Sequence, residues 1–142
     1  MIVLDTNVLS ELMRPIPDAN VRHWLDAQVP GQLWLSSITV AEILVGIARL
    51  PEGKRKTGLS TMASALFAED FANLILSFDS KAASHYAELV ATREKAGKPI
   101  SMADAQIAAT CKSAPSGATT LATRNTKDFI ELGVTLINPW AG

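Results

Sequence analysis

Short apolar runs that alternate with helix-like stretches are the feature that most constrains the fold of this chain. The runs lie at residues 2–4, 33–35, 74–78, 118–122 and 134–137. They are largely continuous rather than alternating with polar residues, which is typical of strands buried on both faces of a parallel sheet. We therefore predict an α/β fold with three layers, α/β/α, in which a mainly parallel sheet of about five strands lies between helices.

The stretches between these runs carry helix start and stop signals. Caps such as Ser101 precede apolar residues at helical spacing, and prolines or glycines such as Pro51 and Gly97 follow them. The predicted helices cover residues 8–13, 18–28, 37–50, 54–71, 80–95, 101–112 and 126–132. The chain thus runs from strand to helix repeatedly, as parallel sheets require.

Composition limits the class of protein. The chain has 142 residues, of which 48% are hydrophobic, so we expect one domain spanning residues 1–142 with a single core. The formal net charge of −1 gives no basic excess, so any attraction for phosphate has to be local. One cysteine, the absence of a basic leader before the first strand and the lack of an apolar run near ~18 residues favour a cytoplasmic protein without membrane spans.

Four acids fall where an open parallel sheet binds its ligands, beyond the carboxyl ends of the strands. Asp5 directly follows the first strand, and Glu42, Asp104 and Asp128 lie in helices that follow strands or caps. Helix capping is the competing interpretation, because Ser101-x-x-Asp104, Thr39-x-x-Glu42 and Asn125-x-x-Asp128 all have capping-box spacing.

Glu42 argues for a metal site over capping alone. Its sequence neighbours are apolar, so we expect a desolvation cost that a cation would relieve. Two carboxylates about 4 Å apart repel by roughly 4 kcal/mol at an effective dielectric near 20, which also favours a cation between converging acids. Oxygen donors suit Mg²⁺, whereas His23 and His85 stand alone as helix-face residues and Cys111 is expected in the core.

Other conspicuous residues have structural interpretations. Trp24, Trp34 and Trp140 are too scattered for a base-stacking platform and are expected to pack in the core or at its edge. The basic run at residues 54–56 is expected to be a solvated helix start, with a phosphate contact as the alternative.

The sequence resembles PIN-domain ribonucleases of the VapC and FitB type, the toxins of bacterial toxin-antitoxin pairs. Four motifs carry this resemblance, and they span almost the whole chain. They are MIVLDTNVLSEL at residues 1–12, SITVAEILxG at 37–46, ISxxDAQIAAT at 100–110 and LATRNxxDF at 121–129. Each is modest alone, and the four in this order are specific.

The resemblance implies a metal-dependent ribonuclease that uses Mg²⁺ or Mn²⁺. Asp5, Glu42 and Asp104 take the family's first three acidic positions, with Asp5 and Asp104 as direct metal ligands. The fourth position falls to Asp128, or to Asn125 as a neutral ligand, because many relatives have an aspartate at the place of Asn125. Groups that position the site or the substrate are Thr6, Asn7, Thr123, Arg124, Asn125 and Arg14.

The resemblance also implies partners besides RNA. A small antitoxin is expected to cross the groove and block the site, and a homodimer is typical. The apolar side chains near Leu9, Leu12 and Trp24 are candidates for facing such a partner.

Two alternatives remain open from the sequence. A phospho-receiver domain would use Asp79, which follows the third apolar run, but the first strand ends in one aspartate rather than an acidic pair. A PIN-like fold without catalysis, acting as a binding module, is suggested by the asparagine at position 125.

Overall fold

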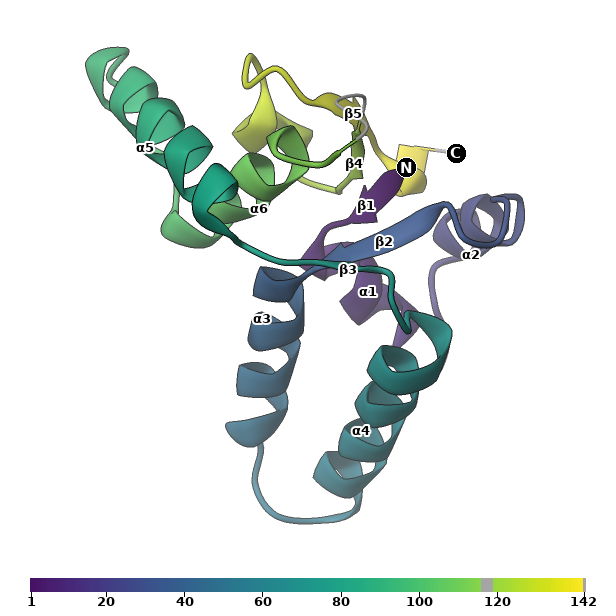
Figure 1. The fold of residues 1–142 in the computed structure, drawn as a ribbon. Helices are drawn as coiled ribbons and strands as arrows, with labels where there is room; N and C mark the ends of the chain where they lie inside the picture. Colours follow the sequence, from purple (N-terminus) through teal and green to yellow (C-terminus); the bar gives the residue numbers. More distant parts are fainter. Residues whose placement is uncertain (116–118, 142) are drawn as a thin grey trace.

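A five-stranded parallel sheet forms the centre of the molecule in this computed structural model, which describes residues 1–115 and 119–141. The strands are β1 (Ile2–Leu4), β2 (Leu33–Ser36), β3 (Ile75–Leu76), β4 (Thr120–Ala122) and β5 (Thr135–Ile137). Their order is β3-β2-β1-β4-β5, and every neighbouring pair is parallel. The chain therefore builds outward from β1 in one direction and then returns to add β4 on its other edge, as Figure 1 shows.

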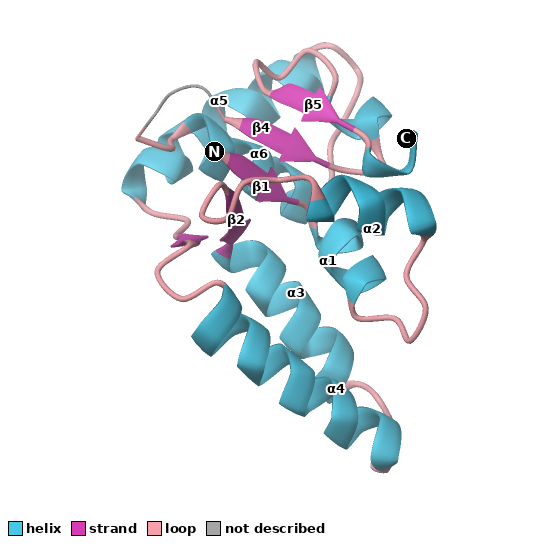
Figure 2. Ribbon diagram, turned by 90° about the vertical axis from the view of Figure 1, so that its right-hand side faces the viewer, coloured by secondary structure: helices cyan, strands magenta, loops and turns pink. Residues whose placement is uncertain are grey.

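Six α-helices connect and cover the strands. They are α1 (Thr6–Leu12), α2 (Ala19–Asp26), α3 (Ser37–Ala48), α4 (Lys54–Ala65), α5 (Ser80–Lys95) and α6 (Met102–Lys112). Three short helical turns complete the described part: the π-helix η1 (Leu66–Asp70) and the 3-10 helices η2 (Thr126–Phe129) and η3 (Pro139–Ala141). Helices α3 and α4 lie side by side and project from the sheet as a hairpin (Figures 1 and 2).

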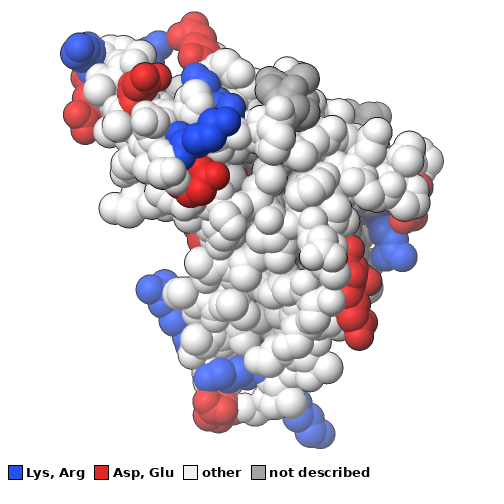
Figure 3. Space-filling view, in the orientation of Figure 1, with Lys and Arg blue, Asp and Glu red and all other residues white. Residues whose placement is uncertain are grey.

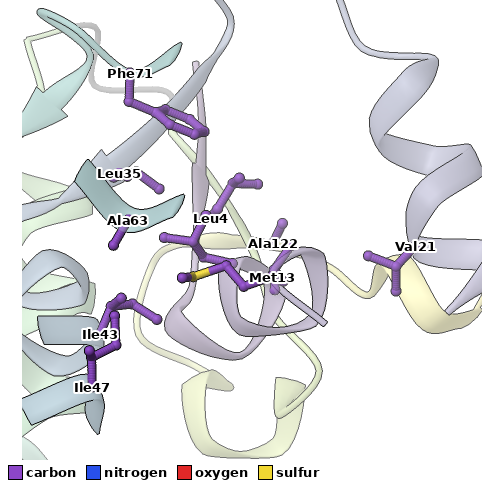
Figure 4. Packing of buried hydrophobic residues seen from close by; sticks show 11 residues of the cluster. Leu4, Met13, Val21, Leu35, Ile43, Ile47, Ala63, Phe71 and Ala122 are labelled. Atoms are coloured by element: carbon purple, nitrogen blue, oxygen red, sulfur yellow. The ribbon is translucent and has the colours of Figure 1, made fainter. Parts of the chain in front are cut away.

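The sheet separates two apolar clusters because successive strand residues point to opposite faces. Leu4, Leu35 and Ala122 pack on the face covered by α1 to α4, and Figure 4 shows them around Met13 of the α1 end and Ile43 of α3. The opposite cluster contains strand residues Val3 and Leu121 together with residues of α5 and α6. The predicted three-layer α/β/α architecture with five parallel strands is confirmed.

Several element boundaries differ from the predicted ones. The third strand is shorter than 74–78, because its partner β2 ends at Ser36 and Ser37 already starts α3; Phe78 donates its backbone N–H to the Ser37 hydroxyl instead (3.1 Å). The helix predicted over 54–71 changes to a π-helix at Leu66, and the one predicted over 126–132 is a single 3-10 helix. Residues 116–118, in the predicted turn and strand start, lie outside the described residues.

Burial corrects two further expectations. Strand β5 lies at the sheet edge and exposes Thr135 and Ile137, so only the inner strands are buried on both faces. Leu9 is fully buried in the core and cannot face a partner, and Leu12 and Trp24 are partly buried against the same cluster. None of the helices in residues 1–115 and 119–141 has the length and apolar character needed to cross a membrane.

Candidate functional site

The carboxyl ends of β1 and β4 meet at the point where the strand order reverses, which is the usual ligand crevice of an open parallel sheet. The register pairs Leu4 with Ala122, and the Asp5 backbone N–H donates to the Ala122 carbonyl (2.9 Å). The next residues, Asp5 and Thr123, are therefore neighbours although 118 positions separate them in sequence. This juxtaposition follows directly from the parallel pairing of the two strands.

Asp5 is held by three donors. Its Oδ1 accepts from the Thr6 backbone N–H (2.8 Å) and caps α1, while its Oδ2 accepts from the Thr123 hydroxyl (2.7 Å) and from the Asn7 amide (3.3 Å). Asp5 is only 4% exposed. Burial raises the pKa of Asp5 from 3.8 to about 6; the Thr123 and Thr6 hydrogen bonds oppose this rise, and the charges of Asp104 and Glu42 add to it.

Asp104 lies at the first turn of α6, where the Ser101 hydroxyl accepts a hydrogen bond from the Asp104 backbone N–H (3.2 Å). The capping role predicted for Ser101 is thus confirmed. Partial burial raises the pKa of Asp104, the Ser101 hydroxyl lowers it, and the charges of Asp128 and Glu42 raise it further. The four predicted acids therefore influence one another electrostatically.

Glu42 is exposed, which corrects the expectation that its apolar sequence neighbours would desolvate it. Adjacent helix residues point about 100° apart, so Ile43 and Ile47 enter the core while Glu42 faces the groove and Leu44 remains half exposed. The acid of the site that is buried without a cationic partner in the described residues is Asp5 instead. The capping interpretation of Thr39 and Glu42 is also wrong, because the cap of α3 is Ser36, which accepts from the Thr39 backbone N–H (3.1 Å).

A chain of hydroxyls ends on Glu42, and sequence reasoning missed it. Thr6 donates its single hydroxyl proton to Glu42 Oε1 (2.6 Å), so in the 3.0 Å contact between Thr6 and Thr39 the proton belongs to Thr39. Ser36 in turn donates to Thr39 Oγ1 (3.3 Å). Ser36 and Thr39 are fully buried, and a polar residue within the apolar run of α3 was the available signal. This series of hydroxyl hydrogen bonds orients the Glu42 carboxylate, which accepts the last of them.

The two candidates for the fourth acidic position, Asn125 and Asp128, line different hollows. Asn125 lines the main groove with Asp5, and its backbone N–H donates to the Thr123 hydroxyl (3.1 Å). Asp128 is exposed and lies with Asp104 and Arg93 in a smaller hollow of about 160 Å³. Asn125 precedes η2 without a side-chain capping bond, so the capping interpretation of this pair is not supported.

The main groove has a volume of about 1040 Å³ and runs from the carboxyl ends of the central strands along the α3–α4 hairpin. Asp5, Glu42 and Asp104 line it at the sheet end, and apolar residues of α3 and α4, such as Ile47 and Leu59, line its middle. Basic residues border it: Arg14, Lys54, Arg55 and Arg124. Figure 3 shows one face of the molecule, on which charged side chains gather around α5 and at the end of the hairpin, with mostly uncharged surface between them.

Oxygen donors dominate the site, as a hard cation requires. No ion pair within the described residues involves Asp5, Glu42, Asp104 or Asp128. Within residues 1–115 and 119–141, however, no set of three histidine, cysteine, aspartate or glutamate side chains is arranged to hold a metal ion. Asp5, Glu42 and Asp104 thus line one groove without closing around one point, which fits an ion held by one or two carboxylates with water and phosphate, as is usual for Mg²⁺.

Other predicted residues have structural roles. Cys111 is buried in the core, and burial raises the pKa of its thiol to about 12, so it is an inert thiol. Asp79 follows the edge strand β3 and caps α5 by accepting from the Ala82 backbone N–H (2.9 Å). Glu11, which sequence reasoning did not select, is a buried acid in the groove wall and pairs with Arg14 (3.2 Å).

Comparison with known proteins identifies the family. Residues 2–134 match the PIN domain family. The chain is 44% identical to VapC ribonuclease Y4jK of Sinorhizobium fredii over 140 residues, 99% of this chain and 98% of the relative, and 42% identical to toxin FitB of Neisseria gonorrhoeae over 99% of both chains. A solved structure of FitAB bound to an IR36 DNA fragment superposes with a TM-score of 0.89 at 42% identity, covering 99% of this chain and 96% of the other. This chain therefore belongs to the PIN-domain family, within its VapC/FitB-type toxins.

Proposed function

We propose that this chain is a metal-dependent endoribonuclease, the toxin of a type II toxin-antitoxin pair. The observation that carries the proposal is the buried carboxylate of Asp5, which has no cationic partner among the described residues and opens onto a groove shared with Glu42 and Asp104. Such an arrangement weakens the metal-free fold, so a role in binding a cation explains it better than a role in stability. The names of the relatives, a VapC ribonuclease and a toxin, support the same activity.

Asp5, Asp104 and Glu42 would hold Mg²⁺ or Mn²⁺, with Asp5 and Asp104 as the direct ligands. When bound, the ion would polarise the scissile phosphate and lower the pKa of a water molecule. The donor set fits because it consists of carboxylates without competing lysine or arginine partners. Thr123 and Asn7 hold the Asp5 carboxylate in place, so its position does not depend on the ion.

The remaining groups would act on water and substrate. Glu42 Oε1 is occupied by Thr6, which leaves Oε2 to orient an attacking water, and Asp128 is placed beside Asp104 for the same task. Arg14 and Arg124 border the groove and would contact neighbouring phosphates of RNA, and Lys54 and Arg55 lie further along it. Asn125 would contribute a neutral amide where many relatives have an acid.

The partner we propose is a small antitoxin that lies across the groove. The groove has an apolar middle and an acidic end, which would suit an antitoxin segment with an apolar stripe followed by a basic side chain. A homodimer and a cytoplasmic location complete the proposal, and light scattering of the purified protein would test the first of these.

A cleavage assay on total RNA tests the activity. We expect the wild type to cleave RNA with added Mg²⁺ or Mn²⁺ and to stop when EDTA is added. The Asp5→Asn and Asp104→Asn variants should lose cleavage while keeping the far-ultraviolet circular dichroism of the wild type. Asp70→Asn is the matched control, since Asp70 is an exposed acid of η1 outside the groove, and it should cleave as the wild type does.

Unchanged cleavage by either groove variant would reject the assignment of these acids. A wild type that is folded but inactive with both metals would instead favour a PIN-like binding module, for which Asn125 is the structural argument. Membership of the PIN family and the capping role of Asp79 leave no support for a phospho-receiver.

A further inference from the structure

Arg124 and Trp140 form a cation–π pair that lines the groove. The Arg124 guanidinium carbon lies 5.0 Å from the centroid of the Trp140 ring, within the range of a cation–π interaction. Arg124 is exposed and Trp140 half-buried, and both side chains line the groove that contains Asp5. Although the tryptophans are scattered in sequence, the fold brings one of them to the site.

This pair is tied to the acidic end of the groove. The Arg124 backbone N–H donates to Asn7 Oδ1 (3.2 Å), and Asn7 donates to Asp5 Oδ2 (3.3 Å). Two hydrogen bonds hold the Trp140 backbone: its N–H donates to Asn138 Oδ1 (2.9 Å), and its carbonyl accepts from the side-chain amide of Asn20 in α2 (3.0 Å). The backbone of both residues is therefore anchored beside the carboxylate cluster.

The arrangement suits a nucleobase better than a phosphate alone. A lysine would contact phosphate equally well, whereas a guanidinium lying over an aromatic ring has a second planar face on which a base can stack. Arg124 takes part in no ion pair with any acid in the described part of the chain, so no carboxylate occupies its edge. Arg124 is exposed and lines the groove, so a ligand in the groove can reach its guanidinium.

We propose that Arg124, supported by Trp140, is a stacking subsite for an unpaired base of the RNA, adjacent to the phosphate at Asp5. The proposal rests on the ribonuclease function and adds to it a contact with one base. A base inside a duplex is already stacked on both faces and cannot enter such a subsite without leaving the helix. Arg124 and Trp140 would therefore act as positioning residues that select an unpaired base beside the scissile phosphate.

Binding of short single-stranded RNA tests this subsite, measured by fluorescence anisotropy in the cleavage-deficient Asp104→Asn protein with Mg²⁺. Arg124→Lys keeps the charge and removes the planar face, so we expect it to weaken binding about five- to tenfold, as the loss of one base stack does. The same oligonucleotide is then tested with an abasic nucleotide at each position in turn. At one position the abasic RNA should bind Arg124→Lys and its parent equally well.

Trp140→Phe and Trp140→Leu complete the test. Phenylalanine keeps a ring beneath Arg124 and should retain most of the base preference, while leucine should lose it; thermal unfolding of both variants checks the fold. Equal affinity of Arg124→Lys and its parent for the unmodified RNA would show a phosphate contact and overturn the subsite. Cleavage by Asp104→Asn would reject only the role of Asp104. If the wild type cleaves no RNA and none binds, the ribonuclease proposal itself fails, and this outcome is distinct from a failure of the subsite.

Discussion

Replacing Asp5 with asparagine should change the stability of the metal-free protein in opposite directions at low and at high pH. Burial holds the pKa of Asp5 at about 6 in the folded protein, against 3.8 for an ordinary aspartate. Between these values the folded chain retains a proton that the unfolded chain has lost. The wild type therefore loses stability as the pH rises through this window, and the loss is complete above the folded pKa.

The magnitude follows from the two pKa values. One pKa unit is worth about 1.4 kcal/mol, so the ionisation of Asp5 costs the wild type roughly 2–3 kcal/mol more at pH 8 than at pH 4. Asparagine avoids this cost because it carries no charge. It keeps an oxygen for the Thr6 N–H but places an amide where Oδ2 accepts from Thr123 and Asn7, which costs about 1–2 kcal/mol at every pH. We expect the variant to be more stable at pH 8 and less stable at pH 4.

Urea unfolding in EDTA at pH 4, 6 and 8 measures this difference. The pH dependence of the remaining groups is common to both proteins and cancels when the variant is compared with the wild type. Asp70→Asn, an exposed acid, should show no such dependence. A difference in unfolding free energy between Asp5→Asn and the wild type that is the same at pH 4 and pH 8 would refute the claim that Asp5 is a buried, destabilising charge.

Three further predictions concern neighbouring groups. Asp104→Asn should raise the melting temperature of the metal-free protein at pH 8, because it removes a charge that is partly buried and repelled by other acids; a clear drop in calorimetry would contradict this. Thr39→Val should lower kcat with little change in KM, because Thr6 then loses the donor that helps orient Glu42, and Thr39→Ser should restore the rate. Of Asn125→Ala and Asp128→Ala, the variant at the true fourth position should show the larger loss of Mg²⁺ affinity in calorimetric titration.

The existence and order of the strands and helices were predictable because caps and apolar runs in the local sequence decide them. Asp79 caps a helix that runs over Ser80–Lys95 as predicted, and the apolar runs became parallel strands in the expected sense. Boundaries failed where a partner decided them: β3 ends early because β2 has already turned into α3. The end of a strand depends on its neighbour in space, which sequence periodicity does not contain.

The sequence motifs predicted which acids line the groove and did not predict how exposed each of them is. Motifs located Asp5, Glu42 and Asp104, but the sequence assigned the desolvated position to Glu42 when it belongs to Asp5. Apolar neighbours along a helix say little about the face on which a residue lies, whereas the end of a central strand is enclosed by the strands beside it. The contact of Arg124 with Trp140 likewise depends on the final turn η3 reaching α2 and the groove.

The proposed function requires a chain with a net charge of −1 to bind RNA, and the distribution of its charges would allow this. Charges separated by more than about 8 Å are largely screened at physiological salt, so the overall charge matters less than what lies within that distance of the phosphate. At the carboxyl ends of the central strands the charges nearest to the phosphate would be carboxylates, which repel RNA unless a cation is bound. On the proposed function, the phosphates on either side of the scissile bond would be attracted by the basic residues along the groove, which are Arg14, Lys54, Arg55 and Arg124. On the proposed function, attraction from the border of the groove and repulsion by the acids would together make productive RNA binding depend on the metal, even before any bond is cleaved.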